Sequence, residues 1–263
     1  MLKFTSISFI TILFFSCANQ TDTSKKNSSN EPITPTEAVE ISKSQTILNE
    51  AILAHGGNLY DSAHYSFDFR DNTYQFKNEG YTYEYSKTVT RTDTIIKDIL
   101  TNDGFNRLVN NVTTLLSDKE KESGVGAINS VIYFATLPYK LNDKAVNTIY
   151  IDSIQIKDQS YDVIEITFDQ AGGGEDHDDE YYYWINKENK KIDYFAYNYS
   201  VNNGGVRFRS AYNSRVVDGI TFQDYINHSA EVGTPLNQLP SLYEAGELVE
   251  VSKVLTENVI NLK

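Results

Sequence analysis

The side chains best suited to bind a metal ion gather in one acidic run, residues 175–180. Carboxylates and an imidazole are ligands for Ca²⁺ or for a transition metal ion. The run lacks EF-hand spacing, and it comes directly after residues 172–174, which are all glycine. A solvated acidic loop is therefore the plainer interpretation, and a weak divalent-metal site is the alternative; we expect no other cofactor. The residues of that metal site would be Glu175, Asp176, His177 and Asp178.

Three arginines on one predicted strand could bind an anion. Arg207, Arg209 and Arg215 are expected to share one face of the strand, because side chains alternate between faces. Guanidinium groups either pair with carboxylates on neighbouring strands, such as Asp193 or Glu165, or line a surface for a carboxylate or phosphate headgroup. Both alternatives stay open.

The strand before these arginines carries an aromatic stripe of alternating residues. Its members are Phe195, Tyr197 and Tyr199. Such a stripe packs in a core more often than it contacts a ligand. The core interpretation is therefore favoured, and a ligand surface is the alternative.

Motifs of nucleophilic or zinc-dependent catalysis are absent from the sequence. It contains no Gly-x-Ser-x-Gly and no His-Glu-x-x-His. The only cysteine is Cys17, and the four histidines are scattered. Enzymatic activity is therefore left open, with a non-enzymatic protein favoured.

Charge and composition exclude one class of partner. The 263-residue chain has a net charge of −13 and contains 19 Tyr and 13 Phe. Nucleic-acid binding needs clustered Lys and Arg, so no nucleic-acid partner is expected. Frequent aromatic residues favour strands, where a ring can pack its body and leave its hydroxyl in water.

The N-terminus is typical of an exported protein. Residues 1–16 have a positive start and a short apolar stretch, as in a signal peptide. Ser16-Cys17 resembles the lipobox at which bacterial lipoproteins are cleaved and lipidated, so we expect Cys17 to carry the lipid anchor. Residues 17–33 are polar and predict a disordered tether, which leaves 34–263 as a single domain. The expected location is the outer membrane, facing the periplasm.

Residues 178–228 predict four consecutive antiparallel strands joined by short turns. Asp218-Gly219 between two β-rich runs is a strong hairpin signal, since a type I′ turn needs positive φ at both positions. Clean alternation along residues 64–89 predicts further strands with one buried face. In all we expect about twelve strands, counted from such runs.

Two helices are predicted outside the strands. The first runs from about Pro35, in the capping box Thr34–Glu37, to Ala54, with His55 as a cation near its C-terminus. A second capping box lies at 117–120, but Gly124 and Gly126 are expected to interrupt the helix there, so that a short apolar helix spans 127–136. Residues 233–246 are expected to form a loop.

These elements together predict a mainly β (α+β) protein. We expect a large, curved antiparallel sheet, or half-open β-barrel, with the N-terminal and mid-chain helices covering its concave face.

The sequence also resembles an uncharacterised family of Bacteroidota lipoproteins. The resemblance is carried by residues 54–57, 134–139, 183–185, 207–209 and 222–225. The architecture of that family is similar to that of LolA/LolB-like lipoprotein carriers. The resemblance implies a half-barrel covered by helices, and it implies no assigned activity.

Three hypotheses of function fit these observations. The favoured one is a non-enzymatic, lipid-anchored envelope protein that binds an amphipathic ligand, such as a lipid or a lipoprotein acyl chain, in the hollow of the sheet. The second is a scaffold for another envelope protein, and the third is a metal-dependent hydrolase at residues 175–180 with His55 or His64 nearby. The ligand contacts of the favoured hypothesis are Arg207, Arg209, Arg215, Tyr197, Tyr199 and Phe134.

Overall fold

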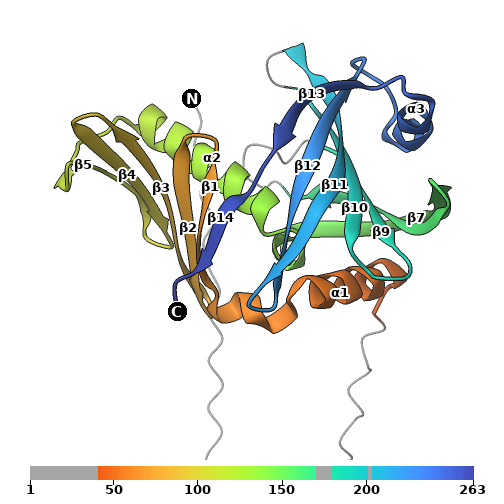
Figure 1. Cartoon of the computed structure of the whole chain (residues 1–263), viewed down its shortest axis with the longest axis horizontal. Coiled ribbons are helices and arrows are strands. Elements are labelled where there is room, and N and C mark those ends of the chain that lie inside the picture. The colour runs from red at the N-terminus through yellow and green to blue at the C-terminus, as the bar shows by residue number, and fades with distance from the viewer. Residues whose placement is uncertain (1–40, 170–178, 201–202) are drawn as a thin grey trace, which may run out of the picture. The chain divides into compact units, whose positions relative to one another are not determined.

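Two antiparallel sheets of seven strands each carry the fold (Figure 1). The computed structural model describes residues 41–169, 179–200 and 203–263. The first sheet has the order β14 (Glu257–Asn261), β1 (His64–Phe69), β2 (Asn72–Glu79), β3 (Thr82–Arg91), β4 (Thr94–Thr101), β5 (Gly104–Val109) and β6 (Val112–Thr113). The second has the order β13 (Val249–Val254), β12 (Ile220–Ala230), β11 (Gly205–Val217), β10 (Ile192–Tyr199), β9 (Tyr181–Asn186), β8 (Gln159–Phe168) and β7 (Val146–Ile156).

Short turns connect most neighbouring strands, as the sequence predicted. Asp218 and Gly219 have φ values of 46° and 88°, which fit the expected type I′ turn between β11 and β12. Longer connections join β8 to β9 and β12 to β13. The pairing of β14 departs from the chain order, because β14 follows β13 and residues 255–256 but pairs with β1, with Tyr65 opposite Asn261. The end of the chain thus passes from one sheet to the other and links them.

The N-terminal helix α1 spans Lys43–His55. Ser42 is its N-cap and accepts a hydrogen bond from the Gln45 amide at 3.2 Å, so the expected start at residue 35 is wrong. The capping box at Thr34 lies outside the described residues. Gly56 ends the helix, and α1 packs against the second sheet through its buried residues Ile47, Leu48 and Ala51.

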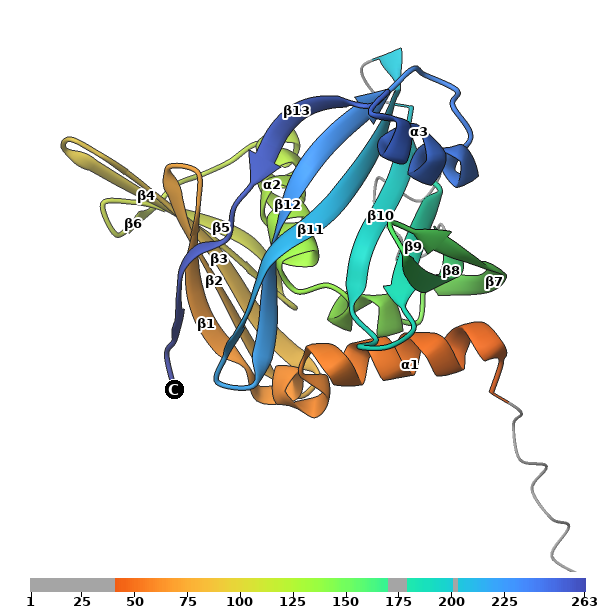
Figure 2. The ribbon, with the colours of Figure 1, turned by 45° about the vertical axis from the view of Figure 1, so that its right-hand side comes forward.

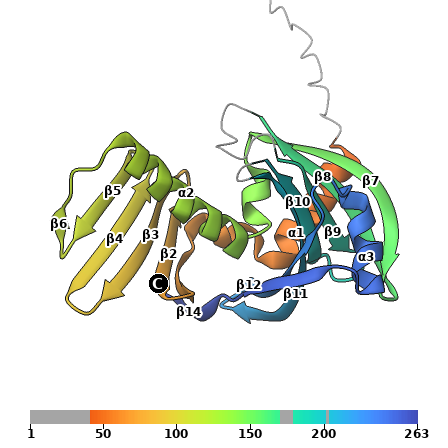
Figure 3. The same cartoon turned by 90° about the horizontal axis from the view of Figure 1, so that it is seen from above.

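The mid-chain helix α2 spans Asp118–Ala135 and begins at the predicted capping box of Ser117 and Glu120. The expected interruption at Gly124 and Gly126 is wrong, because the helix runs through both residues. At Gly124 a Cβ atom would lie 2.2 Å from Cζ of Phe105, so the missing side chain lets α2 approach β5. Figure 2 and Figure 3 show α2 crossing the inner face of the first sheet towards the second.

The two sheets differ in how they are covered. On the first sheet one face is buried beneath α2, with a cluster that includes Phe67, Tyr74 and Phe76. The second sheet is buried on both faces, with Tyr183 and Phe195 on one side and Trp184 and Phe208 on the other.

The outer face of the second sheet is covered by a helix that the sequence analysis did not predict. Residues 233–246, expected as a loop, contain a 3₁₀ turn (Leu236–Gln238) and helix α3 (Leu239–Ala245). Leu236 and Leu239 are buried in the cluster on that face, so packing against the sheet explains why this segment folds.

The sheets do not close into a barrel. The described residues form a half-open arrangement of antiparallel strands with few helices, as the sequence predicted. Residues 104–113 form two short strands, β5 and β6, with Asn110 and Asn111 at positive φ between them. None of the described helices is both long and apolar enough to span a membrane.

Candidate functional site

A hollow of about 460 Å³ lies between the two sheets beside the second half of α2. The first sheet contributes aromatic residues, including Phe67 and Tyr74, and the second contributes Tyr197, Arg209 and Tyr225. The helix contributes residues from two successive turns, which are Ser130, Val131, Phe134 and Ala135. The lining thus combines aromatic and aliphatic side chains with polar and charged ones. A cavity that places a few polar groups among apolar surface can hold a small organic ligand.

Arg209 is the most unusual residue of this lining. Its side chain is only 8% exposed, and its Nη2 donates a hydrogen bond to Tyr197 Oη at 2.9 Å. Its Nε and Nη1 are buried and have no hydrogen-bond partner among the described residues. A buried charge of this kind is normally paired, because removing it from water is costly.

Aromatic rings supply most of the contacts of Arg209. Its guanidinium carbon lies 4.1 Å from the centroid of the Phe134 ring and 5.3 Å from that of Phe195. Phe134 also stacks on Phe195 with the centroids 5.5 Å apart. Cation–π contacts attract the guanidinium but leave its in-plane N–H groups unused. Arg209 is therefore held in place while two of its nitrogens still lack an acceptor.

Three of the six residues proposed from sequence as ligand contacts line the hollow: Phe134, Tyr197 and Arg209. Arg207 and Tyr199 are near neighbours but do not line it. Arg207 donates to Tyr199 Oη and to the Val206 carbonyl. The guanidinium of Arg207 and the hydroxyl of Tyr199 are thus hydrogen-bonded to each other beside the hollow.

Arg215 lies on the opposite face of β11 from Arg207 and Arg209, contrary to the expected common face. Tyr212 pairs with Asp224 and Arg215 with Phe222, so a bulge inserts one residue between the two pairs and reverses the alternation. Arg215 Nη1 lies 3.1 Å from Asp224 Oδ1. Pairing with a carboxylate was one expected alternative, but the partner is neither Asp193 nor Glu165.

The aromatic stripe on β10 packs in the core, as favoured, and one of its rings also lines the hollow. Phe195 is fully buried in the core of the second sheet. Tyr197 stacks on Phe134 with the ring centroids 5.9 Å apart and also lines the hollow.

Two further cations of the lining, Lys87 and Arg70, were missed in the sequence analysis. Lys87 lies opposite Tyr74 in the first sheet, and Arg70 comes directly after β1. A signal was available, because Lys87 falls on the aromatic side of the alternating strand that contains Tyr83 and Tyr85. A charged residue at such a position needs an explanation.

Asn227 is a second polar residue of the lining with an unused group. It lies opposite Arg209 in the strand pairing, and its Nδ2 donates to Ser252 Oγ at 3.2 Å. Its Oδ1 is buried without a partner among the described residues. Arg209 on β11 and Asn227 on β12, which both have polar atoms without a partner among the described residues, are therefore neighbours in the sheet.

Burial keeps two tyrosines of the hollow, Tyr74 and Tyr225, in the neutral form. Burial raises the pKa of Tyr225 and of Tyr74, and it also raises the pKa of Tyr183 behind them. Their hydroxyls therefore stay protonated near neutral pH and add no negative charge to the site.

His55 lies in the last turn of α1, as predicted, but its burial does not favour the cation that was expected there. It is 1% exposed, its Nδ1 donates to the Ala51 carbonyl at 2.8 Å, and its Nε2 lies 3.0 Å from Gln223 Oε1. Burial lowers the pKa of this imidazole, which favours the neutral form. His55 joins α1 to β12 and does not line the hollow.

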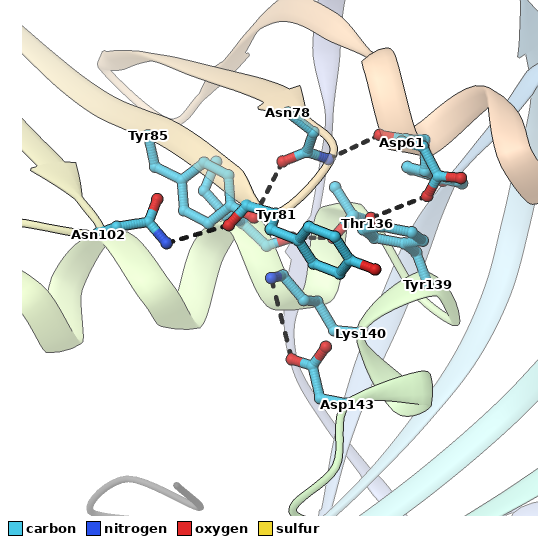
Figure 4. Close-up of polar contacts among 11 residues, drawn as sticks. Asp61, Asn78, Tyr81, Tyr85, Asn102, Thr136, Tyr139, Lys140 and Asp143 are labelled. Atoms are coloured by element: carbon cyan, nitrogen blue, oxygen red, sulfur yellow. Dashed lines mark hydrogen bonds and ion pairs between the residues drawn. The ribbon is translucent and has the colours of Figure 1, made fainter.

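A second polar cluster lies where α2 leads into the next turn, and Figure 4 shows its contacts. Lys140 Nζ lies 5.3 Å from the Tyr85 ring centroid and 3.9 Å from Asp143 Oδ2. Tyr139 Oη donates to Asp61 Oδ1 at 3.4 Å. These groups have partners within the fold, so the cluster has a structural role.

The proposed metal ligands at 175–178 lie outside the described residues, as does Cys17. Elsewhere in the described chain, no three His, Cys, Asp or Glu side chains gather as a metal site would require. The metal hypothesis stays untested, and His64, proposed beside it, lies on β1.

Comparison with protein families gives one assignment. Residues 36–257 match the model of a family of unknown function, DUF6503. The chain belongs to this family. The match spans nearly all the described residues, so the hollow lies within the matched region, and β14 is the one strand of the two sheets that extends past it. No curated protein matches the chain.

Three solved structures are similar to this chain at low identity. A LolA superfamily protein from Nitrosomonas europaea is 14% identical with a TM-score of 0.49, covering 85% of this chain and 94% of that one. A candidate outer membrane lipoprotein-sorting protein domain from Vibrio parahaemolyticus is 9% identical with a TM-score of 0.38, covering 83% and 92%. A DUF1329 family protein from Desulfovibrio piger is 10% identical with a TM-score of 0.40, covering 83% and 93%. The function of this chain therefore has to be argued from its own residues.

Proposed function

We propose that this protein is a non-enzymatic, lipid-anchored protein of the cell envelope that binds an amphipathic, lipid-like ligand between its two sheets. The proposal of a lipid anchor rests on the signal-like residues 1–16 and on Cys17. The binding function rests on one observation in the structure, the hollow of mixed lining in which a buried arginine has two nitrogens without a partner among the described residues.

The lining matches the two parts of an amphipathic molecule. Phe67, Val131 and Phe134 offer apolar surface for a hydrocarbon chain. Burial of such a chain is favourable at about 25 cal/mol for each Å² of apolar surface removed from water. Arg209 offers hydrogen-bond donors for a polar head. Phe134, Tyr197 and Arg209 are thus the proposed ligand contacts.

Two neighbouring residues of α2 provide a matched test. Ser130 and Asn129 are both exposed, but only Ser130 lines the hollow. A tryptophan at position 130 should occupy part of the hollow, whereas a tryptophan at 129 should point away from it. Because both wild-type side chains are exposed, neither change is expected to prevent folding.

The measurement is the binding of cetyl alcohol, an uncharged amphiphile, to the full chain. We expect Ser130→Trp to weaken binding at least about tenfold, a loss of about 1.4 kcal/mol, while Asn129→Trp binds like wild type. Equal loss in both variants, or failure of wild type to bind cetyl alcohol and its charged analogues of the same chain length, would contradict the proposal.

A further inference from the structure

Every charged side chain that lines the hollow is a cation. These residues are Arg70, Lys87 and Arg209, and no Asp or Glu among the described residues belongs to the lining. This is unexpected in a chain whose net charge is −13, with 36 acidic residues against 23 basic ones. The hollow therefore has a local charge opposite to that of the protein as a whole.

None of the three cations is paired with a carboxylate among the described residues. The carboxylate opposite Lys87 in the strand pairing is Asp98, but Arg107 already binds it through two hydrogen bonds of 2.6 and 2.8 Å. Arg209 has only the Tyr197 hydroxyl as an acceptor in the described part of the chain. Asp98 is thus bound by Arg107, and the cations of the hollow have no carboxylate partner among the described residues.

The three cations differ in depth. Arg209 is buried on the second sheet, Lys87 is half-buried on the first, and Arg70 is exposed where β1 ends. Positive charge is therefore present on both walls and continues to the surface. An arrangement of this kind attracts an anion from solution and binds it most strongly where water is excluded.

We infer that the ligand carries an anionic group, a carboxylate or a phosphate, which Arg209 binds while Lys87 and Arg70 attract it towards the hollow. This inference rests on the proposed function and specifies the charge of the ligand. A neutral ligand would leave Arg209 as an unpaired buried charge, and a cationic one would be repelled by all three side chains. An anion supplies the acceptors that Nε and Nη1 lack.

A series of ligands with one tail and different heads tests the inference. Palmitate, cetyl phosphate, cetyl alcohol and cetylamine are titrated against the full chain below their aggregation concentrations. Charge-assisted hydrogen bonds contribute about 1.5–3 kcal/mol, so the better anion should bind about 10- to 150-fold more tightly than the alcohol. Comparing palmitate with cetyl phosphate shows which anion the site prefers.

Variants show whether Arg209 causes the preference for an anionic head over the alcohol. Arg209→Met should bring the affinity for the anions close to that for the alcohol, and Lys87→Met should reduce the preference by a smaller factor. Arg207→Met is the matched control, because Arg207 lies two residues away on the same face of β11 but does not line the hollow. That control should keep the wild-type preference.

Each outcome has a separate meaning. Tighter anion binding that Arg209→Met removes would support the inference. Equal affinity for anion and alcohol, or a preference that Arg209→Met leaves intact, would overturn the inference and leave the proposed function standing. Failure of every amphiphile to bind would overturn the proposed function itself.

Discussion

The two halves of α2 contact opposite kinds of surroundings. Near its start the helix packs without a gap, since Gly124 lies directly against Phe105, and Arg107 of the same strand is paired with Asp98. Near its end the helix faces the hollow, where Phe134 covers the unpaired Arg209. Both regions contain an arginine and aromatic rings. The fold supplies a carboxylate acceptor to Arg107 but not to Arg209. This difference distinguishes a structural arginine from one that is available to a ligand.

The largest expected effect contrasts these two arginines in stability. Arg107→Met leaves the carboxylate of Asp98 nearly buried without its cation, and we expect the free energy of unfolding to fall by about 2–3 kcal/mol. Arg209→Met removes an unpaired charge, so the free energy of unfolding should stay within about 1 kcal/mol of wild type or rise. Urea unfolding of both variants measures the difference.

A double variant provides the control for this contrast. Asp98→Asn added to Arg107→Met removes the stranded negative charge and should recover part of the lost stability. If Arg209→Met were as destabilising as Arg107→Met, Arg209 would be a structural residue, and the comparison between the two regions would fail.

Two glycines of α2 provide a second test of the comparison. Changing each to alanine should alter the free energy of unfolding by a smaller amount, and in opposite directions. Gly124→Ala places a methyl group against Phe105 and should cost about 1–3 kcal/mol, as overpacking does. A Cβ atom at Gly126 meets nothing within 4 Å, so Gly126→Ala should add about 0.5–1 kcal/mol through helix propensity. Thermal unfolding of both variants should therefore give shifts in opposite directions. Equal shifts would mean that the close packing at Gly124 is not what holds this half of the helix.

The smallest effect concerns His55, a buried titratable group held between α1 and β12. Burial lowers its pKa below the ordinary value of 6.5, so the unfolded chain binds the proton more readily than the folded protein does. The free energy of unfolding should therefore be constant well above pH 6.5 and fall as the pH drops below it. The slope due to one proton is at most about 1.4 kcal/mol per pH unit.

His55→Gln isolates this contribution, since burial also lowers the pKa of His228. The variant should lose less stability than wild type between about pH 7.5 and pH 5.5, the range around the ordinary histidine pKa. An equal loss would show that His55 does not contribute to the pH dependence.

Much of the sheet could be predicted from the sequence because its signals are local. Alternating aromatic residues and the turn at Asp218-Gly219 depend on neighbouring residues alone, and the hairpins they indicated are present. The capping box at Ser117 is likewise a local signal, and it correctly marks the start of α2.

The errors occurred where distant residues decide the structure. Gly124 weakens a helix in isolation, but here it permits contact with Phe105 on another element. Leu236 and Leu239 fold onto the sheet only because its outer face buries them. A bulge near Asn213 reverses the face of Arg215, and a pattern of period two cannot show such an insertion.

The candidate site was predicted in part for the same reason. Arg209 was identified as an arginine beside an aromatic stripe, but the sequence could not distinguish it from Arg215. The contribution of the first sheet to the hollow was not predicted, because Lys87 and Arg70 lie far from Arg209 along the chain. Only the packing of both sheets around α2 brings these cations together.

Native mass spectrometry of the full chain, purified gently from its native cells, tests the central claim most directly. We predict a bound mass that organic solvent releases as an amphipathic molecule, and we predict that Ser130→Trp reduces the bound fraction while Asn129→Trp does not. A protein that carries nothing in wild type and both variants, and that takes up no added amphiphile, would contradict the claim.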